Sequence, residues 1–169
     1  MPESELPKGF EPLIGTEESS LDDKGRILFS KKKRERLGDG FVILIGKLNC
    51  LILYPASIWK LLVNEALRGP VMDPAREDFT RLLLGTASDR LSFDAQNRIV
   101  IPKELRKEAR LHEDDKVHIV GCGNRVEIWS HDEWAKFQGN PENYEKDRRQ
   151  TFDRLYDTLL RRNAQGELA

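Results

Sequence analysis

The sequence predicts an α+β fold in which two copies of one strand-rich unit share a single core. Residues 22–26 begin with Asp and end with Arg, and the same Asp-x-x-x-Arg spacing returns 72 positions later at residues 94–98. Three apolar residues follow each Arg. An internal repeat of this period indicates two copies of one structural unit. About forty residues per copy is marginal for independent folding, so we expect the copies to share a core.

Each copy is predicted to open with a β-hairpin. In the first copy a strand ends near Leu21, the turn runs through residues 23–25, and the return strand covers residues 26–29. Gly25 can adopt the positive φ that such a three-residue turn requires. Asn97 stands at the matching place in the second copy and is among the few other residues that tolerate this conformation. The turn geometry is therefore the feature that we expect both copies to retain.

A short helix and two further strands follow each hairpin. Ser30 and Pro102 directly follow the return strands, and both residue types suit the start of a helix. The joins between the later strands contain Gly and Asn, which favour hairpin turns. The expected helices cover residues 31–36 and 103–109, and the expected strands cover residues 41–45, 50–54, 116–120 and 125–129.

Helices are expected to close both units and to end the chain. Tyr54 and Trp59, like Trp129 and Trp134, lie five residues apart at strand-to-helix junctions, where core packing is their expected role. Ser130 and Glu133 form a capping box, in which each side chain reaches an exposed N–H of the other residue. The first unit's closing helix is expected at residues 57–68 and a linker helix at residues 73–85.

The last helix is expected at about residues 143–162. Its apolar residues recur at three- and four-residue steps, as in an amphipathic helix. They are Phe152, Leu155, Tyr156, Leu159 and Leu160. The predicted organisation is therefore a flexible tail (1–12), a first unit (13–68), a linker helix (69–88), a second unit (89–137), and a C-terminal helix and tail (138–169).

Composition excludes several classes of protein. With 38% hydrophobic and 34% charged residues, the chain resembles an ordinary soluble protein. It has no apolar run of the roughly 20 residues that span a bilayer, and no signal-peptide pattern, so the cytoplasm is the expected location. Two cysteines and three histidines without metal-ligand spacing predict neither a disulfide framework nor a metal site. Catalytic and cofactor motifs are also missing, so we expect no enzyme and no cofactor.

Charge is segregated along the chain although the net charge is only -1. Residues 24–36 contain seven Lys or Arg residues against the single acidic Glu35, whereas Glu11, Glu17 and Glu18 precede the first repeat. Such segregation can create a local positive field on a nearly neutral molecule.

The Asp-x-x-x-Arg element is the main candidate for function. Its carboxylate can accept hydrogen bonds from the turn or from the Arg, which would restrict the guanidinium. The planar donors of Arg suit a phosphate or the edge of guanine. A single Asp and Arg around a turn usually form only a solvated ion pair. The duplication, with basic residues at matching helix positions (Lys31 and Arg34, Lys103 and Arg106), favours DNA binding instead.

Several segments together resemble the MraZ family. They are residues 21–26, residues 53–55 with Trp59, residues 81–88 and residues 124–129. The likeness extends over about residues 13–137. It implies two AbrB-like swapped-hairpin units that share a small β-barrel-like core. It also implies a DNA-binding transcription factor, usually the repressor of its own division and cell-wall operon, that binds promoter repeats as a ring-like homo-oligomer associated with the nucleoid.

The resemblance makes the two turns the DNA-facing elements. The predicted DNA-binding residues are Asp22, Lys24, Arg26, Lys31, Lys33, Asp94, Arg98 and Lys103. The chain departs from the family pattern at two places near the turns: Ser30 replaces a usual proline, and Asn97 replaces the second glycine. Gln96 is uncharged where the first copy has Lys24, so the two turns can contribute unequally.

One alternative from another class of protein stays open. The apolar stripe of the helix at residues 143–162 could recruit a protein partner, which would make the chain an interaction or assembly module without DNA. Capture of a stoichiometric partner without retardation of promoter DNA would favour that interpretation.

Overall fold

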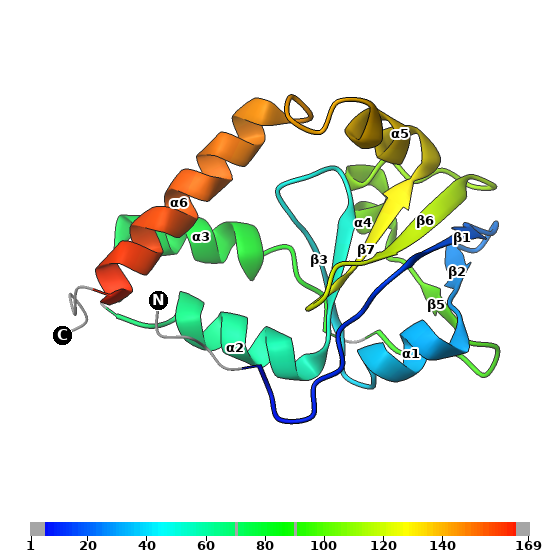
Figure 1. The fold of residues 1–169 in the computed structure, drawn as a ribbon, viewed down its shortest axis with the longest axis horizontal. Coiled ribbons are helices and arrows are strands. Elements are labelled where there is room, and N and C mark those ends of the chain that lie inside the picture. The colour runs from blue at the N-terminus through cyan, green and yellow to red at the C-terminus, as the bar shows by residue number, and fades with distance from the viewer. Residues whose placement is uncertain (1–5, 70, 90, 165–169) are drawn as a thin grey trace.

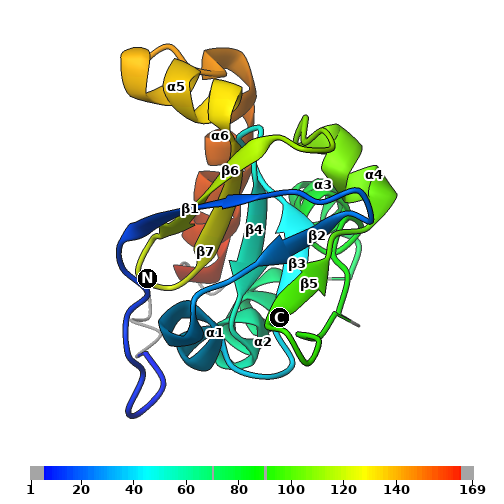
Figure 2. The same cartoon turned by 90° about the vertical axis from the view of Figure 1, so that its right-hand side faces the viewer.

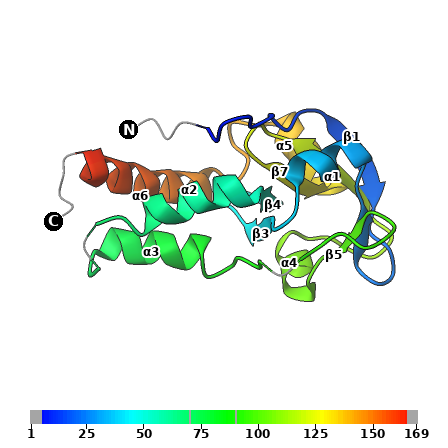
Figure 3. The same cartoon turned by 90° about the horizontal axis from the view of Figure 1, so that it is seen from below.

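The computed structural model describes residues 6–69, 71–89 and 91–164, so the outermost parts of the two predicted tails lie outside the described residues. Figures 1 and 3 show the strands gathered on one side of the molecule and α2, α3 and α6 lying together on the other. The strands are β1 (Thr16–Ser20), β2 (Arg26–Leu28), β3 (Val42–Ile45), β4 (Leu51–Tyr54), β5 (Arg98–Val100), β6 (Lys116–Gly121) and β7 (Val126–Ser130). The helices are α1 (Lys31–Leu37), α2 (Ala56–Ala66), α3 (Pro74–Leu83), α4 (Lys103–Glu108), α5 (His131–Gly139) and α6 (Lys146–Ala164).

Both copies contribute strands to each of two antiparallel sheets. The larger sheet has the order β1-β6-β7-β4-β3, and β2 pairs with β5 in the smaller one. At the centre of the larger sheet Ile52 faces Glu127, and in the smaller sheet Ile27 faces Ile99. Each of these pairs joins equivalent positions of the two copies. The repeat therefore folds with an approximate two-fold symmetry that the sequence offset alone does not reveal.

The β-barrel-like core that the sequence led us to expect is not observed. Among the described residues, β1 and β3 form opposite edges of an open five-stranded sheet, and β2 with β5 forms a separate sheet. An α+β fold with antiparallel sheets is confirmed, but the paired strands do not close into a barrel.

One apolar core joins the two sheets. Ile27 and Ile99 are fully buried and belong to the same cluster as Leu51 and Val117 of the larger sheet. Burying each such side chain contributes about 1.5–3 kcal/mol. The inner face of the small sheet therefore packs against the large sheet, and the outer face of the small sheet is exposed.

The C-terminal helix uses its apolar side within the fold. Phe79 of α3 lies 6.0 Å from Phe152 and 5.7 Å from Tyr156 of α6, measured between ring centroids. Leu159 is fully buried, whereas the side chain of Leu160 lies outside the described part. The amphipathic helix is thus confirmed, and its stripe packs on α3. None of the described helices is long and apolar enough to cross a bilayer.

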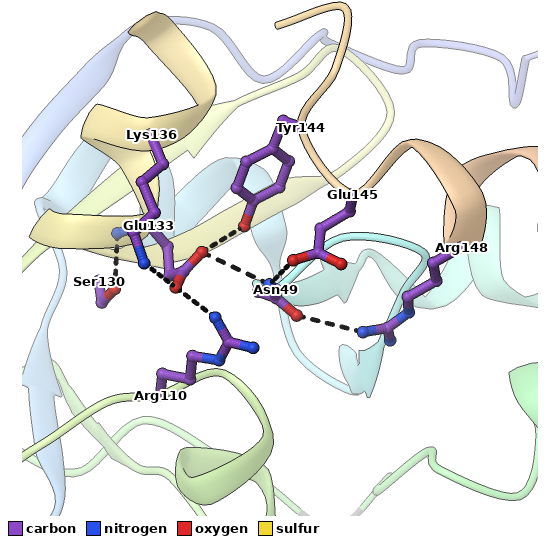
Figure 4. Close-up of polar contacts among 8 residues, drawn as sticks. All are labelled: Asn49, Arg110, Ser130, Glu133, Lys136, Tyr144, Glu145 and Arg148. Atoms are coloured by element: carbon purple, nitrogen blue, oxygen red, sulfur yellow. Dashed lines mark hydrogen bonds and ion pairs between the residues drawn. The ribbon is translucent and has the colours of Figure 1, made fainter. Parts of the chain in front are cut away.

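The capping box at α5 forms only in part. The hydroxyl of Ser130 accepts a hydrogen bond from the N–H of Glu133 at 3.1 Å, as expected. The Glu133 carboxylate does not reach back, however. It accepts hydrogen bonds from Tyr144 Oη and Arg110 Nη1, both at 2.7 Å, and from Lys136 Nζ at 3.3 Å (Figure 4). The sequence pattern did not indicate that the Glu133 carboxylate connects α5 to more distant parts of the chain.

A second set of polar contacts holds the start of α6. Asn49, in the loop between β3 and β4, donates to Glu145 at 2.7 Å and accepts from Arg148 at 3.2 Å (Figure 4). Asn49 also lies 3.4 Å from the Glu133 carboxylate. The contacts of Glu133 and Asn49 therefore join the second unit, the first unit and the C-terminal helix.

Candidate nucleic-acid interface

The first turn is organised by the carboxylate of Asp22. Its Oδ1 accepts hydrogen bonds from the backbone N–H of Lys24 at 3.0 Å and of Arg26 at 2.8 Å. Its Oδ2 accepts from Nε of the Arg26 guanidinium at 2.6 Å. Gly25 has a φ of 74°, the conformation that the turn requires. One side chain thus fixes both the turn and the guanidinium that leaves it.

The second turn repeats this arrangement bond for bond. Asp94 accepts from the N–H of Gln96 at 2.8 Å, from the N–H of Arg98 at 2.9 Å, and from Arg98 Nε at 3.1 Å. Asn97 has a φ of 64°, so the prediction that Gly25 and Asn97 share a backbone conformation is confirmed.

Partial exposure leaves both ion pairs on the surface. The side chains of Arg26 and Arg98 are 24% and 26% exposed. Burial opposes ionisation of Asp22, but the hydrogen bonds from Arg26 and Lys24 together outweigh it and lower the pKa of Asp22. The hydrogen bond from the Arg98 backbone is the main cause of a lowered pKa of Asp94. In the described part of the chain only Nε of each guanidinium is engaged by its Asp, which leaves the outer Nη donors for a ligand.

The two arginines lie on one face of the β2–β5 ribbon. Arg26 faces Val100, and Leu28 faces Arg98. Because side chains alternate along a strand, these four share the outer face and the two central isoleucines share the inner one. Figure 2 looks onto the end of the molecule that carries this ribbon. Arg26, Leu28 and Arg98 also line one open depression beside β1. The two guanidinium groups can therefore reach a single ligand.

The two copies support each other's turns. The carbonyl of Gly25 accepts from the N–H of Ile101 at 2.8 Å, and the carbonyl of Asn97 accepts from the N–H of Phe29 at 3.1 Å. Each basic helix consequently begins beside the turn of the other copy: α4 beside Gly25, and α1 beside Asn97. The basic run of residues 31–34 therefore starts beside the turn of the other copy, although in the sequence it follows Arg26 of its own copy.

The remaining predicted residues differ in their exposure. Lys24, Lys31 and Lys103 are not buried, and Lys31 lies 3.8 Å from Glu35. Lys33, by contrast, is only 6% exposed, and its Nζ donates to the carbonyl of Ile14 at 3.1 Å. The ammonium of Lys33 is therefore used inside the protein and is separated from the accessible basic residues.

Three further residues belong to this region: Leu28 and Val100, which the sequence did not point to, and Arg106, which was noted only as a basic residue matching Arg34. Leu28 and Val100 are 53% and 52% exposed on the ribbon. The guanidinium of Arg106 lies against Gly25 in the turn of the first copy. Each of the three has an equivalent in the other copy, so the repeat itself contained a signal that could have identified them.

The fold and the site together define a tandem-repeat protein that displays a duplicated, carboxylate-held arginine turn on one β-ribbon. The family model described as MraZ protein, antitoxin-like, matches residues 13–82 and again residues 84–155. The chain belongs to the MraZ family, a family of transcriptional regulators and not of enzymes.

Several relatives are named Transcriptional regulator MraZ. The chain is 39% identical over 130 residues to the protein from Natranaerobius thermophilus, and the match covers 77% of this chain and 89% of the relative. It is 37% identical over 128 residues to that from Alkaliphilus oremlandii, covering 76% and 87%. It is 32% identical over 134 residues to that from Clostridium tetani, covering 79% and 92%. Both Asp-x-x-x-Arg turns lie within the segments that match the family model.

Proposed function

We propose that this protein is a sequence-specific DNA-binding regulator that contacts promoter DNA through its two Asp-x-x-x-Arg turns. The observation that carries the proposal is the placement of Arg26 and Arg98 on one outer face of the β2–β5 ribbon, each held by its own carboxylate. A restrained guanidinium loses less conformational freedom on binding a phosphate or a base than a free one does.

Accessible lysines give the same end of the molecule additional cationic groups. Lys24 lies in the first turn, and Lys31 and Lys103 open the two helices that begin beside the turns. We assign these lysines to phosphate contacts, which position the protein, and the arginines to contacts that include base edges. Lys33 is left out of the interface because its ammonium is buried.

Membership of the family supports a proposal for the regulatory setting. We propose that several copies form a ring-like homo-oligomer on the repeats of the chain's own promoter and repress division and cell-wall genes from the nucleoid. Few contacts per subunit give weak, salt-sensitive binding, and linked subunits increase it through effective concentration. Strands of one copy pair with strands of the other, which supports an AbrB-like swapped-hairpin framework for each subunit.

The alternative of a DNA-free interaction module finds less support. It rested on the apolar stripe of the C-terminal helix, but this stripe packs on α3.

The test is a gel shift of the DNA upstream of the chain's own gene with the double variant Arg26→Ala, Arg98→Ala at two salt concentrations. We expect loss of the complex with an unchanged fold and oligomer. The matched control is Arg68→Ala, Arg81→Ala, which removes two exposed arginines from the helical side of the molecule. Affinity that survives in the folded turn variant, or that falls equally in the control, would refute the proposal.

A further inference from the structure

The outer face of the ribbon presents two exposed apolar side chains between its arginines. Leu28 and Val100 are about half exposed, and they occupy equivalent positions of the two copies. Leu28 lies directly opposite Arg98, and Val100 directly opposite Arg26. Scattered apolar side chains on a surface are common. Leu28 and Val100 are not scattered in this way: besides the two arginines, they are the residues on the outer face of the ribbon, and both are apolar.

The spacing of the four side chains suits a DNA groove. Diagonal neighbours across an antiparallel pair lie about 7–8 Å apart, which is the relation between Arg26 and Arg98. That separation corresponds to about two base-pair steps at roughly 3.4 Å each. The major groove admits a two-stranded β-ribbon, and only there does thymine expose its C5-methyl group. Phosphates offer nothing to an apolar side chain.

We infer that Leu28 and Val100 read thymine methyl groups in the major groove, beside guanines that Arg26 and Arg98 contact. This inference rests on the proposed function and adds to it the nature of the readout. The ribbon combines two hydrogen-bond donors for guanine with two apolar groups for thymine. It therefore distinguishes base pairs by hydrogen bonding and by apolar contact at neighbouring positions. The inner face, with Ile27 and Ile99 buried, holds the ribbon in place against the core.

The experiment removes the methyl groups from the DNA. The region upstream of the chain's own gene is amplified either with dTTP or with dUTP, so that the two duplexes differ only in the thymine methyls. Wild-type protein is expected to bind the uracil duplex about fourfold more weakly for each methyl that it buries. The variant Leu28→Ala, Val100→Ala is expected to bind both duplexes equally, at the level of wild type on uracil DNA.

A matched pair of exposed apolar residues provides the control. Val71 and Met72, between α2 and α3, are 86% and 80% exposed. The variant Val71→Ala, Met72→Ala should keep the wild-type preference for thymine. Thermal unfolding checks that each variant is folded; because Leu28 and Val100 are exposed, the fold should tolerate their truncation.

The outcomes separate the inference from the proposed function. Equal wild-type affinity for both duplexes, with binding still dependent on Arg26 and Arg98, would overturn methyl readout alone. Absence of wild-type binding to either duplex would overturn the proposed function and the inference together. A thymine preference that persists in Leu28→Ala, Val100→Ala would refute the assignment. So would a smaller oligomer in that variant with an unchanged preference, since the apolar pair would then contact another copy.

Discussion

Arg106 of the second copy lies against Gly25 in the turn of the first copy. A Cβ placed on Gly25 would come within 2.7 Å of Cζ and Nη1 of Arg106. Nε of Arg106 is buried and has no hydrogen-bond partner in the described part of the protein. Packing against the turn, more than hydrogen bonding, therefore holds this guanidinium in place. The guanidinium in turn covers the turn at Gly25.

Substitution of Gly25 should be costly for two reasons. Gly25→Ala places a side chain at a φ of 74° and forces Arg106 to move, so we expect the free energy of unfolding to fall by more than the about 1–2 kcal/mol of backbone strain alone. Gly123→Ala is the control, since Gly123 lies between the paired strands β6 and β7, has a φ of 82° and has nothing within 4 Å of the added Cβ. Urea unfolding measures both. An equal loss in the two variants would show that the Arg106 contact is unimportant.

The carboxylate of Asp22 should be needed to position Arg26. Removing an acidic residue near DNA should by itself strengthen binding, because repulsion of phosphates is relieved. We nevertheless expect Asp22→Ala to weaken DNA binding about tenfold, since the Arg26 guanidinium loses its charge-assisted hydrogen bond. Fluorescence anisotropy with labelled promoter DNA measures the change. The neighbouring variant Asp23→Ala, which alters an exposed carboxylate, should bind as tightly as wild type or more tightly. Tighter binding by both variants would contradict the positioning role.

The repeat accounts for the burial of Lys33, a residue that the sequence predicted to contact DNA. Lys33 stands 72 positions before Leu105, and both are buried on the inner side of their helices. Lys33 lies in a basic run, but the residue at the equivalent position of the second copy is apolar. A lysine can occupy it because its long stem packs against the core while its ammonium reaches the Ile14 carbonyl.

Lys33 and Lys31 should therefore respond differently to substitution. Lys33→Leu copies the residue of the second unit, and we expect an unchanged fold and an unchanged salt dependence of DNA binding. Lys31→Ala should lower the slope of log affinity against log salt by about 1, the value for one phosphate contact. Titrations at several salt concentrations measure both slopes. A lowered slope in Lys33→Leu would show that the buried ammonium does reach DNA.

Local chemistry made most of the elements predictable. The turn residues Gly25 and Asn97, the cap residue Ser30 and the strand patterns identified turns, strands and helices close to their observed ends. The opening hairpins were wrong as strand pairs, because β1 pairs with β6 and β2 with β5, and among the described residues only a single bridge, between Leu21 and Ile27, crosses the first turn. The pairing of β2 with β5 was not predictable, because local sequence specifies an element but not its partner in another copy. The same is true of the crossed support between each helix and the opposite turn. Two similar copies can pair their strands in several ways, and the packing of the core determines which pairing forms.

Glu133 shows the same limit for a single side chain, and it leads to a pH dependence of stability. Its spacing from Ser130 suggested a local cap, whereas its partners lie on α5, in the loop before α6 and beyond α4. Burial opposes ionisation of Glu133, but hydrogen bonds from Tyr144, Arg110 and Lys136 prevail and lower its pKa from 4.5 to about 2. The charged form is therefore the one that the folded protein stabilises.

A carboxyl whose pKa is lower in the folded state adds stability above its unfolded pKa and loses it as the pH falls through the folded pKa. We expect Glu133→Gln to lower the free energy of unfolding by about 2 kcal/mol at neutral pH, since four side-chain donors lose a charged acceptor. The difference from wild type should shrink as the pH falls from about 5 to about 2. Urea unfolding at a series of pH values measures it, with Glu142→Gln as the exposed control on the adjoining segment. A difference that stays constant down to about pH 2 would mean that packing, and not the carboxylate charge, holds α5, the second unit and the C-terminal helix together.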